Sequence, residues 1–237
     1  LYLGTWSTEE RDGVFYCVSV TDEDPQQTAE IKPYTWQLRH PGGFYWAGAY
    51  ATDDYLIVGS DDGQPAGQFG ESAVLYSLNP LTGAVLDSIT GIKGDIRSTI
   101  AYDAVTDRVY FSTKGGILGS VKVNVDGSFA TETYQTVQLN GMCTGTPMIT
   151  NGRIYIGVAG ASQFAGSDHT LYVVQAANLA ILDKLFIPGY PQASALASQA
   201  YAEQDGKVYV YITYNQHPGG IYAFADSLDG SGLTGYN

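Results

Sequence analysis

The chain has 237 residues, of which 44% are hydrophobic, 13% aromatic and 15% charged, and its formal net charge is −13. This composition is typical of an ordered globular chain and excludes a disordered one. Nucleic acid and anionic membranes are disfavoured as partners, because a negative surface repels phosphate groups. No stretch is apolar over the length that a membrane helix needs, so we expect no membrane insertion.

One short strand pattern with alternating Tyr, Val and Ile recurs along the chain. It occurs five times, at Leu1–Thr5, Leu56–Ser60, Val109–Thr113, Ile154–Val158 and Val208–Ile212. The central residues are Tyr2, Ile57, Tyr110, Tyr155 and Tyr209, and consecutive ones lie 45 to 55 residues apart. A recurrence at this spacing indicates a repeat architecture. We expect Tyr110, Tyr155 and Tyr209 to be mostly buried between repeats, with their hydroxyls hydrogen-bonded.

The same kinds of segment surround each recurring strand. Strands rich in small residues are predicted before it, at Ala47–Ala51, Ser98–Asp103, Thr146–Thr150 and Leu196–Ala202. A third strand follows it, at Val14–Val20, Ala73–Leu78, Leu118–Val123, Thr170–Val174 and Ile221–Ala225. A fourth, more polar strand is predicted at Glu30–Gln37, Val85–Ile89, Glu132–Gln138 and Ile181–Phe186. This gradient from small and apolar to polar is typical of the blades of a β-propeller.

The sequence therefore predicts an all-β fold, a β-propeller of about five blade-like units of antiparallel strands. We expect one domain over 1–237, with units near 1–41, 42–92, 93–139, 140–188 and 189–237. The first unit begins at its second strand, and the last shows three strands and then a Gly-rich tail. We expect both to be incomplete and the chain to be an arc of a longer propeller. Since open strand edges recruit partners, self-association through these units is a further expectation.

The segment Leu75–Leu86, LYSLNPLTGAVL, resembles the quinoprotein-like (PQQ-type) propeller repeat. In that family the third strand ends in a LYALD-like run, turns through a Thr-Gly pair, here Thr82-Gly83, and returns on a fourth strand. The family's docking Trp on the fourth strand is replaced here by Asp87. The resemblance implies a propeller fold and allows PQQ or calcium as a cofactor.

Three other segments resemble propeller proteins secreted by, or displayed on the surface of, Gram-positive gut bacteria. They are GGFYWAG (Gly42–Gly48), GDIRSTIAYD (Gly94–Asp103) and GYPQASAL (Gly189–Leu196). This resemblance implies a secreted or cell-surface location.

A candidate ligand site is created by the repeat itself. The pattern Gly-x-x-X precedes each inner strand and places Trp46, Arg97, Thr144 and Gln192 at equivalent positions. In a propeller these positions lie around one mouth of the central channel, where Trp46 and Arg97 would suit a flat or anionic ligand. In the alternative interpretation Trp46 packs between blades and Arg97 pairs with Asp95 or Asp103.

Other residues that could carry chemistry show no catalytic or metal-binding spacing. His40, His169 and His217 have no neighbouring ligand. Cys17 and Cys143 are expected to be buried single residues, or else one distant disulfide. The acidic runs Asp22-Glu23-Asp24 and Asp61-Asp62 could hold calcium, but are explained as turn residues. We expect no catalytic residue, no metal site and no cofactor, with calcium or PQQ as alternatives.

Two functional classes remain open. The first is a non-catalytic extracellular binding or scaffold module that holds a protein or glycan through its loops and channel mouth. Long polar connections at Thr21–Thr28, Asp61–Glu71 and Gly160–Asp168 suit that role. The alternative is a quinone (PQQ)-dependent dehydrogenase, or a degenerate relative of one.

Overall fold

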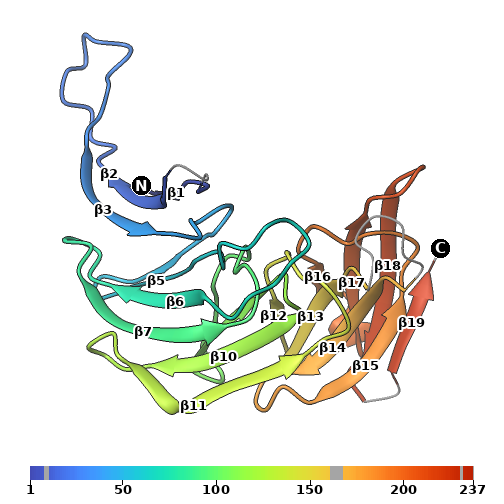
Figure 1. Cartoon of the computed structure of the whole chain (residues 1–237). Helices are drawn as coiled ribbons and strands as arrows, with labels where there is room; N and C mark the ends of the chain where they lie inside the picture. The colour runs from blue at the N-terminus through green and yellow to red at the C-terminus, as the bar shows by residue number, and fades with distance from the viewer. Residues whose placement is uncertain (8–10, 161–167, 230–231, 237) are drawn as a thin grey trace. The chain divides into compact units, whose positions relative to one another are not determined.

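The computed structural model describes residues 1–7, 11–160, 168–229 and 232–236. Its strands form five antiparallel sheets, in each of which strands adjacent in sequence are adjacent in space (Figure 1). The one helix among the described residues, α1 (Ala202–Asp205), has four residues. The predicted fold class, an all-β chain of five blade-like units, is confirmed. In the described part of the chain, no helix has the length and apolar character needed to span a membrane.

The first two sheets contain the amino-terminal strands. The first sheet is made of β1 (Tyr2–Gly4), β2 (Gly13–Val18) and β3 (Tyr34–His40). The second sheet is made of β4 (Tyr50–Ala51), β5 (Leu56–Gly59), β6 (Ala73–Leu78) and β7 (Val85–Ile92). The connection between β2 and β3 projects away from its sheet (Figure 1).

The other three sheets each have four strands. The third contains β8 (Ala101–Asp103), β9 (Arg108–Ser112), β10 (Ile117–Val123) and β11 (Phe129–Gln138). The fourth contains β12 (Met148–Thr150), β13 (Arg153–Val158), β14 (Thr170–Gln175) and β15 (Ile181–Phe186). The fifth contains β16 (Leu196–Ser198), β17 (Lys207–Tyr214), β18 (Gly220–Ser227) and β19 (Gly232–Tyr236).

The prediction of an incomplete last unit is wrong, because β19 supplies its fourth strand. The segment that forms β19 lacks apolar alternation, which is why it was expected to be a tail. Its backbone nonetheless pairs with β18 from Ala223 to Ser227. Backbone hydrogen bonds alone can add an outer strand to a sheet, so a polar or Gly-rich sequence does not prevent pairing.

The turn between β6 and β7 shows how the PQQ-like motif folds. The Asn79 carboxamide oxygen accepts hydrogen bonds from the backbone N–H groups of Leu81 and Thr82, both at 3.0 Å. Gly83 has φ of +72°, and a Cβ there would lie 2.5 Å from the Trp36 ring. The Trp36 indole N–H donates to the Pro80 carbonyl at 2.9 Å. A tryptophan on the last strand of the first sheet therefore docks on this turn, which explains why glycine is required there.

The described residues form two compact units. The first comprises Leu1–Arg97 and Val123–Phe129, and the second comprises Ser98–Lys122 and Ala130–Asn237. In the first unit, buried side chains of the first two sheets form one core, which includes Phe15, Phe44 and Leu78. The single domain over 1–237 stays a prediction.

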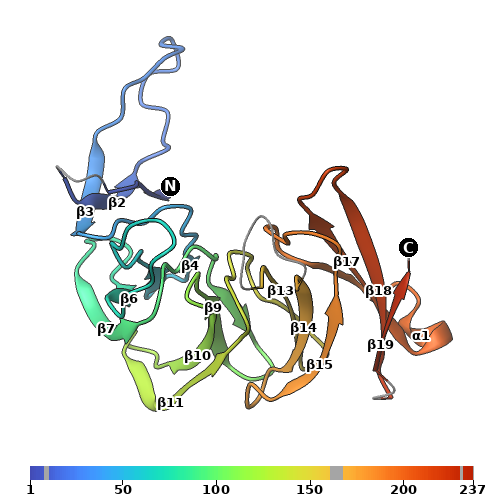
Figure 2. The ribbon, with the colours of Figure 1, turned by 45° about the vertical axis from the view of Figure 1, so that its right-hand side comes forward.

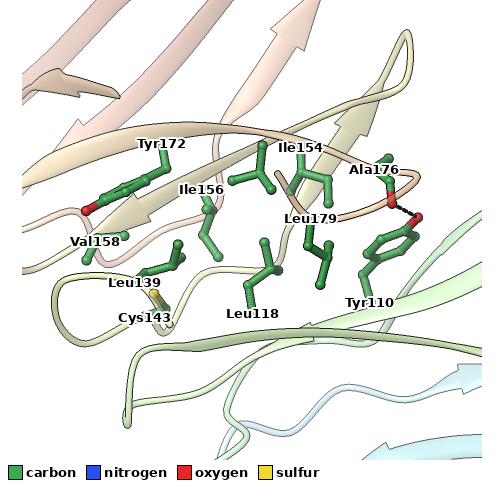
Figure 3. Close-up of a cluster of buried hydrophobic side chains, with 11 residues drawn as sticks. Tyr110, Leu118, Leu139, Cys143, Ile154, Ile156, Val158, Tyr172, Ala176 and Leu179 are labelled. Carbon is green, nitrogen blue, oxygen red and sulfur yellow. Dashed lines mark hydrogen bonds between the residues drawn. The ribbon is translucent and has the colours of Figure 1, made fainter. Parts of the chain in front are cut away.

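In the second unit, two groups of described buried side chains form cores between neighbouring sheets. One joins the third and fourth sheets through side chains that include Tyr110, Ile154 and Cys143 (Figure 3). The other joins the fourth and fifth sheets through side chains that include Tyr155 and Phe224. Within each unit, apolar faces of neighbouring sheets thus bury one another, as blade packing requires.

The recurring tyrosines do not all have the predicted environment. Tyr110 and Tyr155 are buried, and their hydroxyls donate to the Ala176 carbonyl at 2.9 Å (Figure 3) and to the Asp226 carboxylate at 2.6 Å. Tyr209 is only half-buried and donates to Asp205, the last residue of the helix α1 directly before β17, at 2.7 Å. The prediction is confirmed for the first two residues. For Tyr209 the expected hydrogen bond is present, but the expected burial is not.

Candidate ligand-binding site

Three aromatic side chains in the first unit lie against one another and form what we call the aromatic stack (Trp6, Tyr45 and Trp46). The Tyr45 ring stacks on Trp6 with centroids 4.6 Å apart and on Trp46 with centroids 4.8 Å apart. The planes differ by 26° and 21°, so the rings are close to parallel. Trp6 is 59% exposed and Trp46 is 55% exposed. Two indoles thus offer large apolar surface to the solvent.

The backbone beneath the stack is held from both sides. Phe44, fully buried, donates its N–H to the Thr5 carbonyl at 2.9 Å, and Trp6 and Gly43 form an isolated β-bridge. The Asp61 N–H donates to the Gly43 carbonyl at 2.9 Å. These bonds connect the stack to the segments after β1 and β5. The backbone that carries the aromatic rings is therefore fixed by hydrogen bonds to two other segments.

Trp46 has an unusual backbone conformation. Its φ is +61°, in the left-handed region. For a bulky residue with a Cβ this conformation costs about 1–2 kcal/mol, and such strain is concentrated at functional sites. The surrounding structure holds an exposed tryptophan in a conformation that glycine would adopt more easily.

Arg97 lies over the stack and is fixed by carboxylates. Its guanidinium carbon is 4.9 Å from the Tyr45 ring centroid and 6.0 Å from that of Trp6. The guanidinium also binds Asp61 through two hydrogen bonds, at 3.0 and 3.4 Å, and Asp95 at 3.0 Å. Both acids are buried. Arg97 is thus pre-oriented over the rings by charge-assisted bonds.

A third buried carboxylate, Asp62, adds to the negative charge near Arg97. It accepts hydrogen bonds from the N–H groups of Gln64 at 2.8 Å and Gly70 at 2.7 Å. Burial raises the pKa of the Asp62 carboxyl above its ordinary value, and the neighbouring Asp95 carboxyl raises it further. Three acidic residues against one arginine disfavour an anionic ligand here. A quinone cofactor that carries carboxylates does not fit these residues, since the positive charge of Arg97 is already matched.

The four residues predicted from the Gly-x-x-X pattern fall into two pairs. Trp46 and Arg97 both contact Tyr45 in the first unit. In the second unit the Thr144 hydroxyl donates to the Gln192 carbonyl at 3.1 Å, and the Gln192 side chain accepts from Asn215 at 3.0 Å. Of the two interpretations of Arg97, pairing with Asp95 is observed. Trp46 lies on Tyr45 and is exposed, which the packing interpretation did not expect.

Several other residues considered from the sequence have structural partners. Asp24 accepts from the Gln26 backbone N–H at 3.1 Å, and Lys32 pairs with Glu23 at 3.7 Å. His40 is buried, its imidazole accepts from the Gly42 N–H at 3.1 Å, and burial lowers its pKa. Within the described ranges, no group of three or more His, Cys, Asp or Glu side chains is placed to hold a metal ion.

The two cysteines are free, and the distant-disulfide alternative is wrong. Cys143 is buried as expected, whereas Cys17 is only half-buried. Of the long polar connections, Asp61–Glu71 begins with the buried acids described above. Most of Gly160–Asp168, namely 161–167, lies outside the described residues.

Sequence reasoning missed Trp6 and Tyr45 as members of the site. A usable signal was present, because Phe44-Tyr45-Trp46 is a run of three aromatic residues directly after Gly42-Gly43. Two glycines allow close backbone approach, and a Cβ at Gly42 would lie 2.0 Å from the Asp61 carbonyl oxygen. Trp6 offered no such signal, since it reaches the site through a β-bridge that only tertiary contacts form.

No protein-family model matches the sequence, and no curated protein sequence matches it. Solved structures are similar. Sqt1 of Chaetomium thermophilum, bound to the N-terminus of a ribosomal protein, is 15% identical, with a TM-score of 0.64 over 98% of this chain and 57% of that one. Quinohemoprotein alcohol dehydrogenase ADHIIG of Pseudomonas putida is 13% identical, with a TM-score of 0.50 over 80% and 33%. A chain of the mitotic checkpoint complex is 10% identical, with a TM-score of 0.57 over 99% and 63%.

The likeness is that of a β-propeller. At these identities it shows the fold alone. The chain spans less than two thirds of each of the three propeller chains. These propellers include both a dehydrogenase and chains in complexes with other proteins, so the fold by itself does not select between the two functional classes that the sequence left open.

Proposed function

We propose that this chain is a non-catalytic binding module that holds a protein segment at the aromatic stack and Arg97. The observation that carries the proposal is the pair of indoles, each more than half exposed and each stacked on Tyr45. Trp, Tyr and Arg are the residue types that dominate binding energy at protein interfaces. Because hydrogen bonds fix the backbone under the stack, the rings are already ordered and less entropy is lost on binding.

The proposed partner segment is basic. The chain carries a formal charge of −13, and the acids Asp61, Asp62 and Asp95 lie beside the stack. A negative surface accelerates association with positive partners and disfavours acidic ones. The structurally similar Sqt1 is bound to a protein N-terminus, which supports peptide binding by a propeller of this kind.

An extracellular location, secreted or at the cell surface, belongs to the same proposal. It is supported by three segments that resemble secreted or cell-surface propeller proteins, namely Gly42–Gly48, Gly94–Asp103 and Gly189–Leu196. Fractionation of the producing cells, with an antibody to the chain, tests it directly. Recovery only from the cytoplasmic fraction would contradict it.

Selection from a displayed library of random peptides tests the proposed binding. We expect enriched peptides to be rich in Lys and Arg and to lose at least about 30-fold in affinity for Trp46→Gly, the loss of a strong interface residue. Glycine suits a φ of +61°, so this variant should keep its stability within about 1 kcal/mol. Loss of binding would then report the indole ring rather than unfolding.

Two controls make the outcome decisive. Tyr34→Ala removes another exposed aromatic ring of the first unit and should leave affinity unchanged. Selected peptides that bind Trp46→Gly as well as the unchanged chain would refute the site. Binding confined to oligosaccharides on a glycan array would mean that the ligand is a glycan and not a protein segment. Sedimentation would show whether the chain instead binds itself, the further expectation from the sequence.

A further inference from the structure

The connection between β5 and β6 contains a short loop, residues 63–70, whose two ends are held by one carboxyl group. The loop leads into β6, which lies beside β7 in the second sheet (Figure 2). One oxygen of Asp62 accepts the Gln64 N–H at 2.8 Å, and the other accepts the Gly70 N–H at 2.7 Å. Asp62 is buried, whereas residues 63–68 are exposed. A buried, ionisable side chain therefore closes an exposed loop.

A second buried carboxyl group, that of Asp95, lies against Asp62. It accepts the Asp62 backbone N–H at 3.1 Å and pairs with Arg97 at 3.0 Å. It also interacts with the Asp62 side chain, by a hydrogen bond and by its charge. Two carboxyl groups that share a site ionise together only at a cost, so one proton between them is favoured.

The charged and titratable residues on the segments around Asp62 are Asp61, Glu71, Lys93, Asp95, Arg97, His40 and Tyr45. Arg97 is engaged by the Asp61 and Asp95 carboxylates, and Glu71 and Lys93 are exposed. Asp95 is the neighbour whose charge raises the pKa of Asp62, in addition to burial.

We propose that Asp62 and Asp95 share one proton at mildly acidic pH and so hold the loop closed, and that loss of this proton loosens the loop as the pH rises. When the loop opens, water reaches Asp62 and its pKa returns toward the ordinary value. The closed loop thus binds the proton more tightly than the open loop, so acidification favours closure. A protonated carboxyl group can still accept the two backbone N–H groups.

The loop begins beside the candidate site. A Cβ on Gly63 would lie 3.3 Å from the Gly42 Cα, and Gly42 directly precedes the segment that carries the aromatic stack. Opening of the loop would therefore change the surroundings of the stack. The loop is followed without any ligand, so the proton switch and the proposed binding can fail separately.

Amide hydrogen exchange of the intact chain, followed by NMR at about pH 5 and about pH 8, tests the switch. Each rate is divided by the intrinsic rate at the same pH, which gives a protection factor. We expect the Gln64 and Gly70 amides to be at least about 5-fold better protected at the acidic pH, the low end of typical coupling between two sites. Amides of β6 report opening of the whole sheet and should not follow this trend. Equal or lower protection of the loop at the acidic pH would overturn the proposal.

Variants assign the effect to the carboxyl pair. Asp62→Asn imitates the protonated state, because its carboxamide keeps an acceptor oxygen and offers an N–H donor to Asp95. Its Gly70 amide should stay protected at both pH values. Asp95→Asn removes the neighbouring charge and should also reduce the pH dependence. Glu71→Gln removes an exposed charge from the same connection and should leave it unchanged. Full pH dependence in Asp62→Asn, or its loss in Glu71→Gln, would refute the pair.

Discussion

The fourth and fifth sheets carry the same strand pattern but place its central tyrosine in opposite environments. Tyr155 in β13 is fully buried and sits in a core with Leu171, Val208 and Phe224. Tyr209, at the corresponding place in β17, is half-buried. The strands are alike, so the difference comes from the neighbouring sheet. A repeat specifies a strand and its direction, while burial depends on what packs against it.

The hydroxyl partners follow the same rule. Tyr2, Tyr110 and Tyr155 each reach the following sheet, at the Pro80 carbonyl, the Ala176 carbonyl and the Asp226 carboxylate. Asp226 also pairs with Arg153, so the Tyr155 hydroxyl joins a buried ionic network. Burial raises the pKa of Tyr155, and the Asp226 carboxylate raises it further. Tyr209 differs because its acceptor, Asp205, is only four residues away in the sequence, in the helix α1.

Replacing the two tyrosines by alanine would test this contrast with the largest effect. Tyr155→Ala should lower the free energy of unfolding by about 3–5 kcal/mol, the cost of removing a buried aromatic ring. Tyr209→Ala should lower it by less than about 1 kcal/mol, because the Tyr209 side chain is only partly buried. Urea unfolding of both variants provides the comparison. A loss under about 1 kcal/mol for Tyr155→Ala would show that the ring is on the surface.

Removing only the hydroxyls would test the contribution of each hydrogen bond to stability separately from that of the ring. Tyr155→Phe should cost about 1.5–3 kcal/mol, because a buried hydrogen bond to a carboxylate is lost. Tyr209→Phe should cost under about 0.5 kcal/mol, since water can replace an exposed partner of Asp205. The same unfolding measurement applies. Equal costs would mean that the two hydroxyls have equivalent surroundings.

Chemical labelling of the two cysteines would test whether reagents reach the core around Tyr110. The expected effect is on the rate of labelling and not on the free energy of unfolding. Burial raises the pKa of Cys143 to about 12, so its thiolate is scarce at neutral pH. Cys17 is half-buried and should react first with iodoacetamide at pH 8, with Cys143 protected until the chain unfolds. Peptide mass mapping of the labelled chain gives the order. Equal labelling in the native state would contradict a closed core.

Much of the fold could be predicted because its signal is local. The recurring strands at Ile154–Val158 and Val208–Ile212 lie within β13 and β17. The inner strand expected at Ala47–Ala51 shortens to β4, the two residues that pair with β5. The site was predicted in part. Trp46 and Arg97 follow from the repeat, while Trp6 does not.

The sequence by itself determined most of the strands, their order and the turns, because alternation, glycine and asparagine act over a few residues, whereas β19 follows from its pairing with β18. The turn with Asn79 and Gly83 is one such case. The tertiary structure decided which residues pack against each face of a strand. It buried Tyr155, left Tyr209 only half-buried and brought Trp6 to Tyr45, because contacts between residues far apart in the chain depend on how whole sheets pack.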